Sequence, residues 1–291
     1  MSANDGEVIG LTLLWGDGNV GKHYNIVIVA EGYQASELDR FASDATAVLT
    51  KFKTSEPFAS SMGALNVFRL DVASTMSGAD DEADGTHVDT YFDAYFDAVT
   101  PRLLCVNDSL VESTVSTAIQ NPNGTAAPVH KILVIVNTSQ DGGSGGTTNG
   151  IAVSASGLAS SSSDVYERTV LHEMGHAFGL CDEYPNETTS MIRLKKAITA
   201  VATPDIMPNL STTYQRDSLP QPWRSLLTPG VPLPTVWVPG DPPLSAATVG
   251  AFPVDDSGYY VPQWSCTMQD SREPYCVVCA TWIGSQLETL K

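Results

Sequence analysis

Apolar runs in the first half of the chain predict buried strands alternating with helices. A short β-branched run at 24–30 and the mainly apolar runs at 65–72 and 131–137 are typical of buried strands. After the first run, apolar residues recur at helical spacing from a candidate N-cap at Ser36 until Pro57 stops the pattern. Because a strand, a helix and a strand follow in this order, we expect a parallel pair with a right-handed crossover.

Helical patterns also predict elements later in the chain. Residues 89–99 and 108–119 fit two helices, and residues 276–290 fit a final one. The first of these carries four aromatic residues as expected core anchors, Tyr91, Phe92, Tyr95 and Phe96. Between 183 and 262 the chain is rich in proline and poor in periodic pattern. We therefore expect loops there, anchored by the burial of Trp223, Trp237 and Trp264.

The segment LHEMGHAFGLCD at 171–182 concentrates the residues that can do chemistry. A serine run before Asp164, with Glu167 three residues on, predicts a capped helix start. On that helix, His172 and His176 lie four residues apart and share one face. This spacing lets two imidazoles hold one zinc ion.

The residues around the two histidines fit the same chemistry. Glu173 stands beside a candidate ligand and can serve as a general base. Gly179 can adopt the left-handed backbone that ends a helix and turns the chain back, and Asp182 follows as a candidate third ligand. Two histidines and one carboxylate leave one zinc position free for water. A helix with two surface histidines and no metal is the alternative.

Residues 151–156 alternate apolar with small polar side chains, as an exposed or edge strand does. They follow the glycine-rich segment DGGSGG at 141–146. An edge strand can pair with an extended peptide, and glycines let a peptide backbone approach closely. We therefore expect this region to bind a ligand through Gly143, Gly145, Gly146, Ile151 and Val153. A flexible hairpin without a ligand is the alternative.

The five cysteines allow two interpretations. Cys181 lies in the histidine segment, and Cys266, Cys276 and Cys279 lie near the end of the chain, so disulfides could tie the two regions together. The competing interpretation is a second zinc site built from the three late cysteines, but no fourth ligand stands at a recognisable spacing. We expect Cys105 to be a buried free thiol.

An acidic loop at 77–89 is similar to the first half of an EF-hand calcium loop, through Asp80, Glu82, Asp84 and Gly85. The second half differs, because Tyr91 stands where the bidentate glutamate belongs. We expect a solvated charge run, with a Ca²⁺ site of another geometry as the alternative.

The net charge of the chain argues against some classes of binding partner. The 15 basic and 33 acidic residues give a formal charge of −18, which argues against nucleic acid and anionic membrane surfaces as partners. No apolar run approaches the length of a membrane span. The N-terminus lacks the basic-then-apolar pattern of a signal peptide. We nevertheless expect a secreted or extracytoplasmic protein, with an export signal removed or another route used; an intracellular protein is the alternative.

A family resemblance follows from these motifs. Residues 172–184, HEMGHAFGLCDEY, resemble the HE-x-GH-x-F-x-L-x-DEY signature of the bacterial IgA-peptidase family of zinc metallopeptidases. The pattern HExxHxxGxxD also resembles the metzincin consensus, with aspartate where most members place a third histidine. EGY at 31–33, EPF at 56–58, NVFR at 66–69, SG at 77–78, the GGSGG loop and the C-x-M and CxxC tail are similar to family features as well.

The resemblance implies a metzincin-like α/β fold. We expect an N-terminal catalytic lobe at 1–182, with a twisted, mostly parallel sheet, an antiparallel edge strand and the active-site helix. An irregular C-terminal lobe at 183–291 would contain a methionine turn at Met268 beneath the zinc and the final helix, within one catalytic domain overall. Because the family varies at position 181, Cys181 invites a bond to a tail cysteine.

The resemblance also implies a function. His172, His176 and Asp182 would bind one catalytic Zn²⁺, and Glu173 would be the general base of an endopeptidase acting on a protein or peptide. Tyr184, Tyr259 and Tyr260 are candidates to stabilise the oxyanion, and Tyr259 and Tyr260 are also candidates to bind the substrate. No spacing selects among the three, and a structural role for each is the alternative. Within the enzyme class, Glu187 is a rival third ligand. A zinc-containing module that recognises a protein or glycan without turnover is the alternative function.

Overall fold

The computed structural model describes residues 5–146, 149–156, 163–184, 207–236, 244–254 and 257–289, with side chains of the helix at 163–177 from Thr169 onward. The chain divides into two compact units. The first comprises Met1–Ala177 and Leu287–Lys291, and the second comprises Phe178–Gln286. The division therefore falls a few residues before Asp182.

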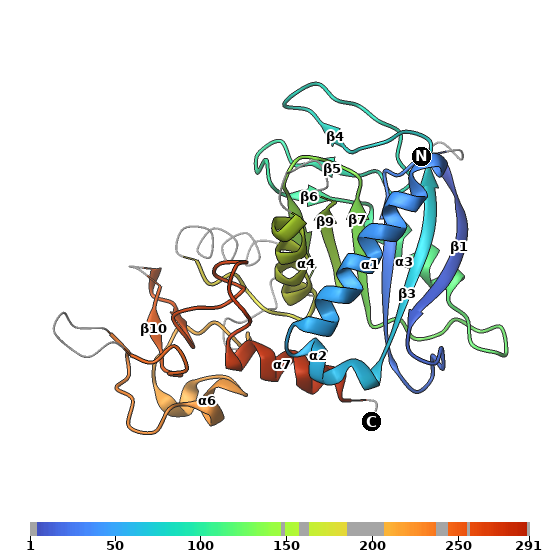
Figure 1. Cartoon of the computed structure of the whole chain (residues 1–291). Helices are drawn as coiled ribbons and strands as arrows, with labels where there is room; N and C mark the ends of the chain where they lie inside the picture. Colours follow the sequence, from blue (N-terminus) through green and yellow to red (C-terminus); the bar gives the residue numbers. More distant parts are fainter. Residues whose placement is uncertain are drawn as a thin grey trace. The chain divides into compact units, whose positions relative to one another are not determined.

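A six-stranded sheet in the order β1-β3-β2-β7-β9-β8 forms the centre of the first unit (Figure 1). Its strands are β1 (Gly6–Trp15), β2 (Tyr24–Glu31), β3 (Leu65–Ser74), β7 (Lys131–Val136), β8 (Gly143–Gly145) and β9 (Ile151–Ala155). The four central strands β3, β2, β7 and β9 run parallel, whereas β1 and β8 pair antiparallel at the two edges. This arrangement confirms the predicted α/β class, with a mostly parallel sheet and an antiparallel edge strand.

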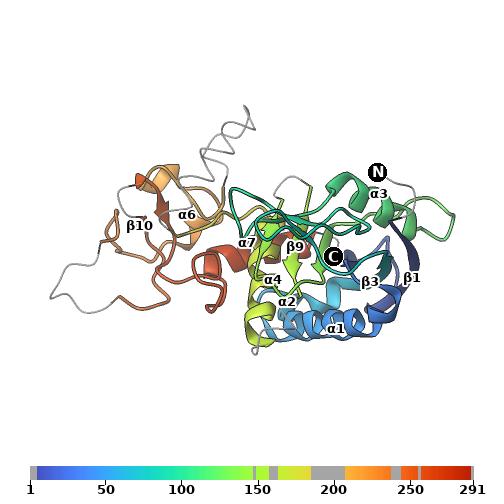
Figure 2. The ribbon, with the colours of Figure 1, turned by 90° about the horizontal axis from the view of Figure 1, so that it is seen from above.

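Helices cover both faces of this sheet. The helix α1 (Leu38–Thr54) lies on one face and α3 (Asp108–Ala118) lies on the other, as the two views show (Figures 1 and 2). The helix α4 (Ser163–Ala177) packs against β8 and β9 and also contacts α1. Shorter helical turns are η1 (Ala35–Glu37), α2 (Phe58–Ser61) and η2 (Met62–Ala64). The crossover from β2 through α1 to β3 therefore has the predicted parallel form.

The helix α1 follows the predicted periodicity but begins differently. Its apolar side chains Phe41, Val48 and Phe52 are fully buried. The predicted cap at Ser36 is wrong, because Ser36 lies inside η1. The main-chain N–H of Gln34 donates to the Glu37 carboxylate at 2.9 Å, so a capping box one turn earlier starts the element.

Two strands differ from the sequence expectation. The sequence analysis did not identify β1, whose apolar residues lack a strict in-and-out alternation; Ile9, for example, is 50% exposed. The edge position predicted for residues 151–156 is wrong. β9 pairs with β7 on one side and with β8 on the other, and all five of its residues are buried. Its small polar side chains reflect tight packing in the sheet interior, and β8 is the edge strand.

The helix predicted at 89–99 is also wrong, and a buried carboxylate explains why. Glu31, at the end of β2, accepts hydrogen bonds from the N–H groups of Phe92 at 3.0 Å and Ala94 at 3.1 Å. These donors are therefore not used in helical hydrogen bonds. Asp93 between them has a φ of 53°, which a regular helix does not allow.

The segment from Phe92 onward forms a small sheet instead of a helix. Two strands of this segment, β5 (Tyr95–Phe96) and β6 (Leu104–Cys105), are joined by β4 (Asp80–Asp81) from the acidic loop, in the order β4-β5-β6. Phe92 and Phe96 are buried as expected, whereas Tyr95 is 45% exposed. The helix predicted at 108–119 is confirmed as α3.

The second unit has little regular structure in its described part, as the prolines predict. It contains η4 (Arg216–Ser218), α6 (Trp223–Leu226), the strand pair β10 (Phe252–Pro253) and β11 (Tyr260–Val261), and the final helix α7 (Val277–Leu287). Trp223 is fully buried and its indole N–H donates to the carbonyl of Gly250 at 2.7 Å, which confirms its role as an anchor. Trp264 is 69% exposed, so that anchor was wrongly predicted. Trp237 lies outside the described residues.

Membrane-spanning helices were searched for throughout the described ranges. No helix there combines the length and the apolar character that crossing a bilayer requires.

The buried Glu31 carboxyl predicts a pH dependence of stability. Burial raises its pKa from the ordinary value of 4.5 to about 7, against the effect of its hydrogen bonds. Between these values the folded protein keeps a proton that the unfolded chain has released, so stability falls as pH rises through this window. At about 1.4 kcal/mol per pKa unit, the loss is on the order of 3 kcal/mol.

Urea unfolding at about pH 5 and about pH 8 measures this effect. Glu31→Gln should be less stable than the parent at the lower pH, because the amide cannot accept from both backbone N–H groups. It should lose less stability than the parent on going to the higher pH. Equal losses in the two proteins would show that Glu31 does not titrate in this range.

Candidate active site

The helix α4 carries the two histidines and the neighbouring glutamate. The rings of His172 and His176 lie 4.9 Å apart between centroids, at an interplanar angle of 86°. Each offers a ring nitrogen, and these nitrogens lie within 4.8 Å of one another. Glu173 and His176 are buried and His172 is partly buried. The histidines therefore sit on a packed helix, which rules out the alternative of two exposed surface histidines.

Local sequence explains this position of α4. Val170, Leu171, Met174 and Ala177 are buried, so the helix is fixed by apolar contacts next to its histidines. The start predicted around Asp164 and Glu167 cannot be compared in detail, because those side chains lie outside the described residues. The helix end agrees with the sequence, since Gly179 has a φ of 91° in the left-handed region.

Two glycines allow β8 to lie directly against this helix. Gly143 and Gly145 are two residues apart, so they face the same side of the strand. A Cβ at Gly143 would lie 2.8 Å from Cγ of Glu173, and one at Gly145 would lie 2.7 Å from the carbonyl oxygen of Glu173. Real Cβ atoms do not approach other atoms this closely. The GGSGG loop thus has a packing function at the histidine helix, in addition to its predicted role in ligand binding.

Within the described residues, the outer edge of β8 is only partly covered. The N–H of Gly143 donates to the carbonyl of Arg102 at 3.1 Å, and the Ser144 hydroxyl donates to the carbonyl of Leu104 at 2.6 Å. Gly145 pairs opposite Ala152 at a position where the antiparallel ladder directs main-chain groups away from β9. The peptide-pairing role predicted for Ile151 and Val153 cannot involve a free edge, because both lie in the interior strand.

In the second unit, Asp182 and Met268 belong to neighbouring segments. Asp182 is buried, and the N–H of the next residue, Glu183, donates to the carbonyl of Met268 at 2.8 Å. Met268 lies in a turn and is fully buried, and its predicted place beneath the zinc stays a prediction. The carbonyl of Phe178 accepts from the indole N–H of Trp282 at 2.8 Å, which fixes the start of this unit against α7.

The predicted disulfides are not formed. All five cysteines are free thiols. Cys181 packs instead among Leu210, Phe252, Val254 and Val261. Its main chain is held by Asn209, whose amide accepts from the Cys181 N–H at 3.0 Å and donates to the Cys181 carbonyl at 2.7 Å. The proposed bond from Cys181 to a tail cysteine is therefore wrong. Cys105 is partly buried, and burial raises its pKa.

The acidic loop hydrogen-bonds to its own backbone. The carboxylate of Asp80 accepts from the N–H of Val88 at 2.6 Å, and that of Asp84 accepts from the N–H of Thr86 at 2.9 Å. Asp80 and Glu82 also line a cavity of 600 Å³ together with Asp93 and Asp97. Within the described part of this loop, no three ligand atoms come close enough to share an ion. Calcium binding stays a prediction.

The candidate tyrosines lie in the second unit. Tyr260, in β11, contacts the ring of Tyr214 at 5.3 Å between centroids, and Tyr259 packs against the apolar cluster around Cys181. Tyr184 is partly buried. The rival ligand Glu187 lies outside the described residues. Sequence reasoning gave no role to Asn209, which stands in no motif, or to Glu183, although the DEY of the family signature contains it.

A helix that carries two imidazoles able to bind a metal ion and an adjacent carboxylate is typical of metal-dependent hydrolases. Comparison with known families specifies this class: the chain belongs to the IgA Peptidase M64 family, whose model matches residues 14–243. The protein is thus a metallopeptidase, and its substrate is a protein or peptide. The match includes α4 and Asp182 but ends before Met268 and the tail cysteines.

Other comparisons add a solved structure. Archaemetzincin from Methanopyrus kandleri aligns at 16% identity with a TM-score of 0.30, covering 56% of this chain and 77% of archaemetzincin. No curated protein matched in the corresponding sequence comparison.

The contact between β8 and α4 can be tested by Gly145→Ala. The new methyl group must push the helix backbone away, and we expect overpacking to cost about 1–3 kcal/mol. The matched control is Gly10→Ala in β1, where a Cβ meets no atom within 4 Å, and a change within about 0.5 kcal/mol is expected there. Thermal or urea unfolding measures both. Equal stability of the two variants would contradict the close contact.

Proposed function

We propose that the protein is a zinc-dependent endopeptidase, with His172, His176 and Asp182 as zinc ligands and Glu173 as general base. The observation that carries this proposal is the pair of imidazoles on the buried face of α4, with the Glu173 side chain directly against the glycine edge strand. Asp182 is included because of its spacing after Gly179 and the family signature.

The donor set fits zinc. Imidazole nitrogens and a carboxylate oxygen are ligands that zinc prefers, and three protein ligands leave an open position, as in catalytic zinc sites. When bound, zinc supplies Lewis-acid activation of water and of the scissile carbonyl. The second candidate, a zinc-containing binding module, lacks a specific observation in its favour, because the base Glu173 is present on the helix.

Glu173 would move the proton that hydrolysis requires. Its carboxylate would accept a proton from the attacking water and return it to the nitrogen of the leaving amine. The amine could then leave as a neutral group. The close contact with Gly143 limits where the Glu173 side chain can lie, because a bulkier residue would occupy its place. Both the strand β8 and the helix α4 thus orient the Glu173 side chain.

The edge strand suggests how a substrate is held. An extended peptide can pair with the outward main-chain groups of Gly145, while the segment ending at Leu104 limits pairing near Gly143. Such pairing uses the peptide backbone and needs no free chain end. This supports endopeptidase activity and a substrate that is locally unfolded. Tyr184, Tyr259 and Tyr260 remain the candidate contacts to the substrate from the second unit.

Glu173→Gln tests the proposed base. We expect kcat/KM for casein to fall by about 10²–10⁴, because a positioned base contributes this much, while zinc content stays unchanged. Glu112→Gln on the exposed side of α3 is the control and should be fully active. Chelation should abolish the parent activity and added zinc should restore it. Full activity of Glu173→Gln would refute the proposed base, and a zinc-loaded parent without cleavage across a peptide library would favour the binding module.

The third ligand is tested by comparing Asp182→Ala with Glu187→Ala. We expect the first variant to hold one zinc ion fewer per chain than the parent, because two imidazoles alone bind zinc weakly. Glu187→Ala should keep the parent zinc content. Elemental analysis of dialysed protein measures both. The opposite result would assign Glu187 as the ligand.

A further inference from the structure

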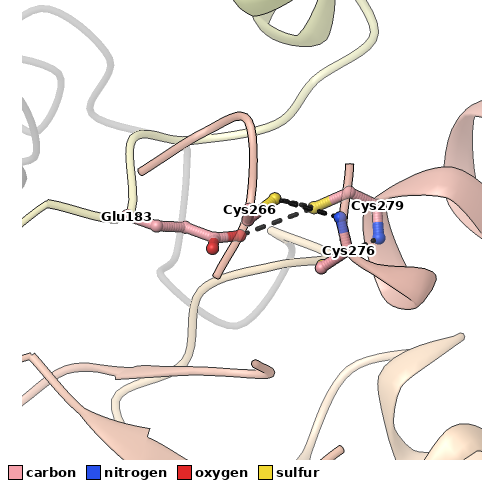
Figure 3. Close-up of side chains that lie close together, drawn as sticks. All are labelled: Glu183, Cys266, Cys276 and Cys279. Carbon is pink, nitrogen blue, oxygen red and sulfur yellow. Dashed lines mark hydrogen bonds between the residues drawn. The ribbon is translucent and has the colours of Figure 1, made fainter. Parts of the chain in front are cut away.

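A second group of metal-binding side chains lies within the second unit. Glu183, Cys266, Cys276 and Cys279 offer one oxygen and three sulfur atoms that all lie within 4.8 Å of one another. Figure 3 shows these side chains converging from three segments of the chain. Glu183 follows Asp182, Cys266 begins the Met268 turn, and the other two cysteines lie at the start of α7. All four are at least 95% buried.

Two distances in this group match the edges of a tetrahedral zinc shell. Sγ of Cys266 and Sγ of Cys279 are 3.7 Å apart, and Sγ of Cys279 is 3.5 Å from Oε1 of Glu183. Around zinc, with Zn–S of about 2.3 Å and Zn–O of about 2.1 Å, the tetrahedral edges are about 3.8 Å between sulfurs and about 3.6 Å between sulfur and oxygen. A disulfide would require about 2.05 Å, so these sulfurs are spaced as ligands are.

The buried carboxyl group of Glu183 needs a partner that the described protein atoms do not fully provide. Its Oε1 accepts from the Asn209 amide at 2.8 Å, but Oε2 is buried and has no hydrogen-bond partner in the described part of the chain. A carboxyl group buried among three thiols is costly unless a cation or donor compensates it. A divalent cation between the four side chains provides this compensation.

Backbone donors are directed at the sulfurs. The N–H of Cys276 lies 3.3 Å from Sγ of Cys266, and the N–H of Cys279 lies 3.4 Å from Sγ of Cys276. Such donors stabilise thiolates, the form that binds a metal. Cys276 also immediately precedes α7, and the positive end of a helix dipole favours a thiolate there.

We propose that Glu183, Cys266, Cys276 and Cys279 bind a structural zinc ion. Three thiolates select zinc over the harder cations Ca²⁺ and Mg²⁺. With four protein ligands the shell is closed, which is the pattern of structural sites. Glu183 is the fourth ligand that the spacing of the three late cysteines did not reveal.

The ion would connect three segments of the second unit, in which the described residues form few helices and strands. It joins the residue after Asp182, the turn of Met268 and the N-terminus of α7, and the Glu183 N–H bond to the Met268 carbonyl lies between them. The claim that this positions a catalytic ligand rests on the proposed role of Asp182. The zinc site itself does not depend on that role.

Zinc counting in the full-length protein tests the proposal. Elemental analysis should give about two zinc ions per chain, with one lost in Cys279→Ser and the other lost in His176→Ala. Cys105→Ser changes a cysteine outside the group and should retain both ions. Asn209→Ala removes the donor to Glu183, and it should weaken zinc retention against a chelator by about 10–100-fold.

Cobalt substitution identifies the ligands independently of activity. Co²⁺-loaded His176→Ala should show thiolate-to-metal charge-transfer absorption in the near ultraviolet, and Cys279→Ser should lack it. The same band in the Co²⁺-loaded parent, together with a zinc-loaded parent that cleaves no substrate, would support the structural site while refuting the proposed function. A single zinc ion that is lost in His176→Ala, or a Cys266–Cys279 disulfide in freshly purified protein, would overturn the structural site.

Discussion

The close approach of β8 to α4 is the contact on which the candidate site depends. A strand carrying side chains at 143 and 145 could not lie at this distance from Glu173 and His176. Glycine costs backbone entropy in a strand, and that cost is tolerated here because the helix occupies the space of the missing side chains. The same contact brings the edge strand β8 next to Glu173, the proposed base. The glycines that allow the packing therefore also line the proposed catalytic residue.

Glu31 supports this edge through the segment that begins at Phe92. Its carboxyl group holds the N–H groups of Phe92 and Ala94 and thereby starts the segment that continues to Leu104. That segment then bonds to Gly143 and Ser144. A buried acidic residue at the end of a central strand thus organises a loop whose far end determines how much of β8 is open. The EGY motif has a structural explanation within the first unit.

Sequence reasoning predicted the features that local pattern determines. The parallel strands, α1, α3, α4 and α7 follow from periodicity, and the two histidines share a face because of helical spacing. The helix expected at 89–99 failed because Glu31, distant in sequence, takes its backbone donors. The edge strand was assigned to 151–156 instead of 143–145, since small side chains look alike in an exposed strand and in a tightly packed interior one. The disulfides failed because three thiols converge on Glu183, a contact that spacing alone does not show.

The adjacent carboxylates at 182 and 183 show how one short segment can serve two purposes. The segment is neither helix nor strand. Glu183 lies against three sulfurs, and Asp182 is the proposed third ligand of the catalytic zinc. The two ligand sets differ in softness, and the proposed sites differ accordingly: one keeps an open position for chemistry and the other is closed. A chain with irregular structure around its proposed third ligand gains from such a site, because a bound ion fixes segments that regular hydrogen-bonded elements do not.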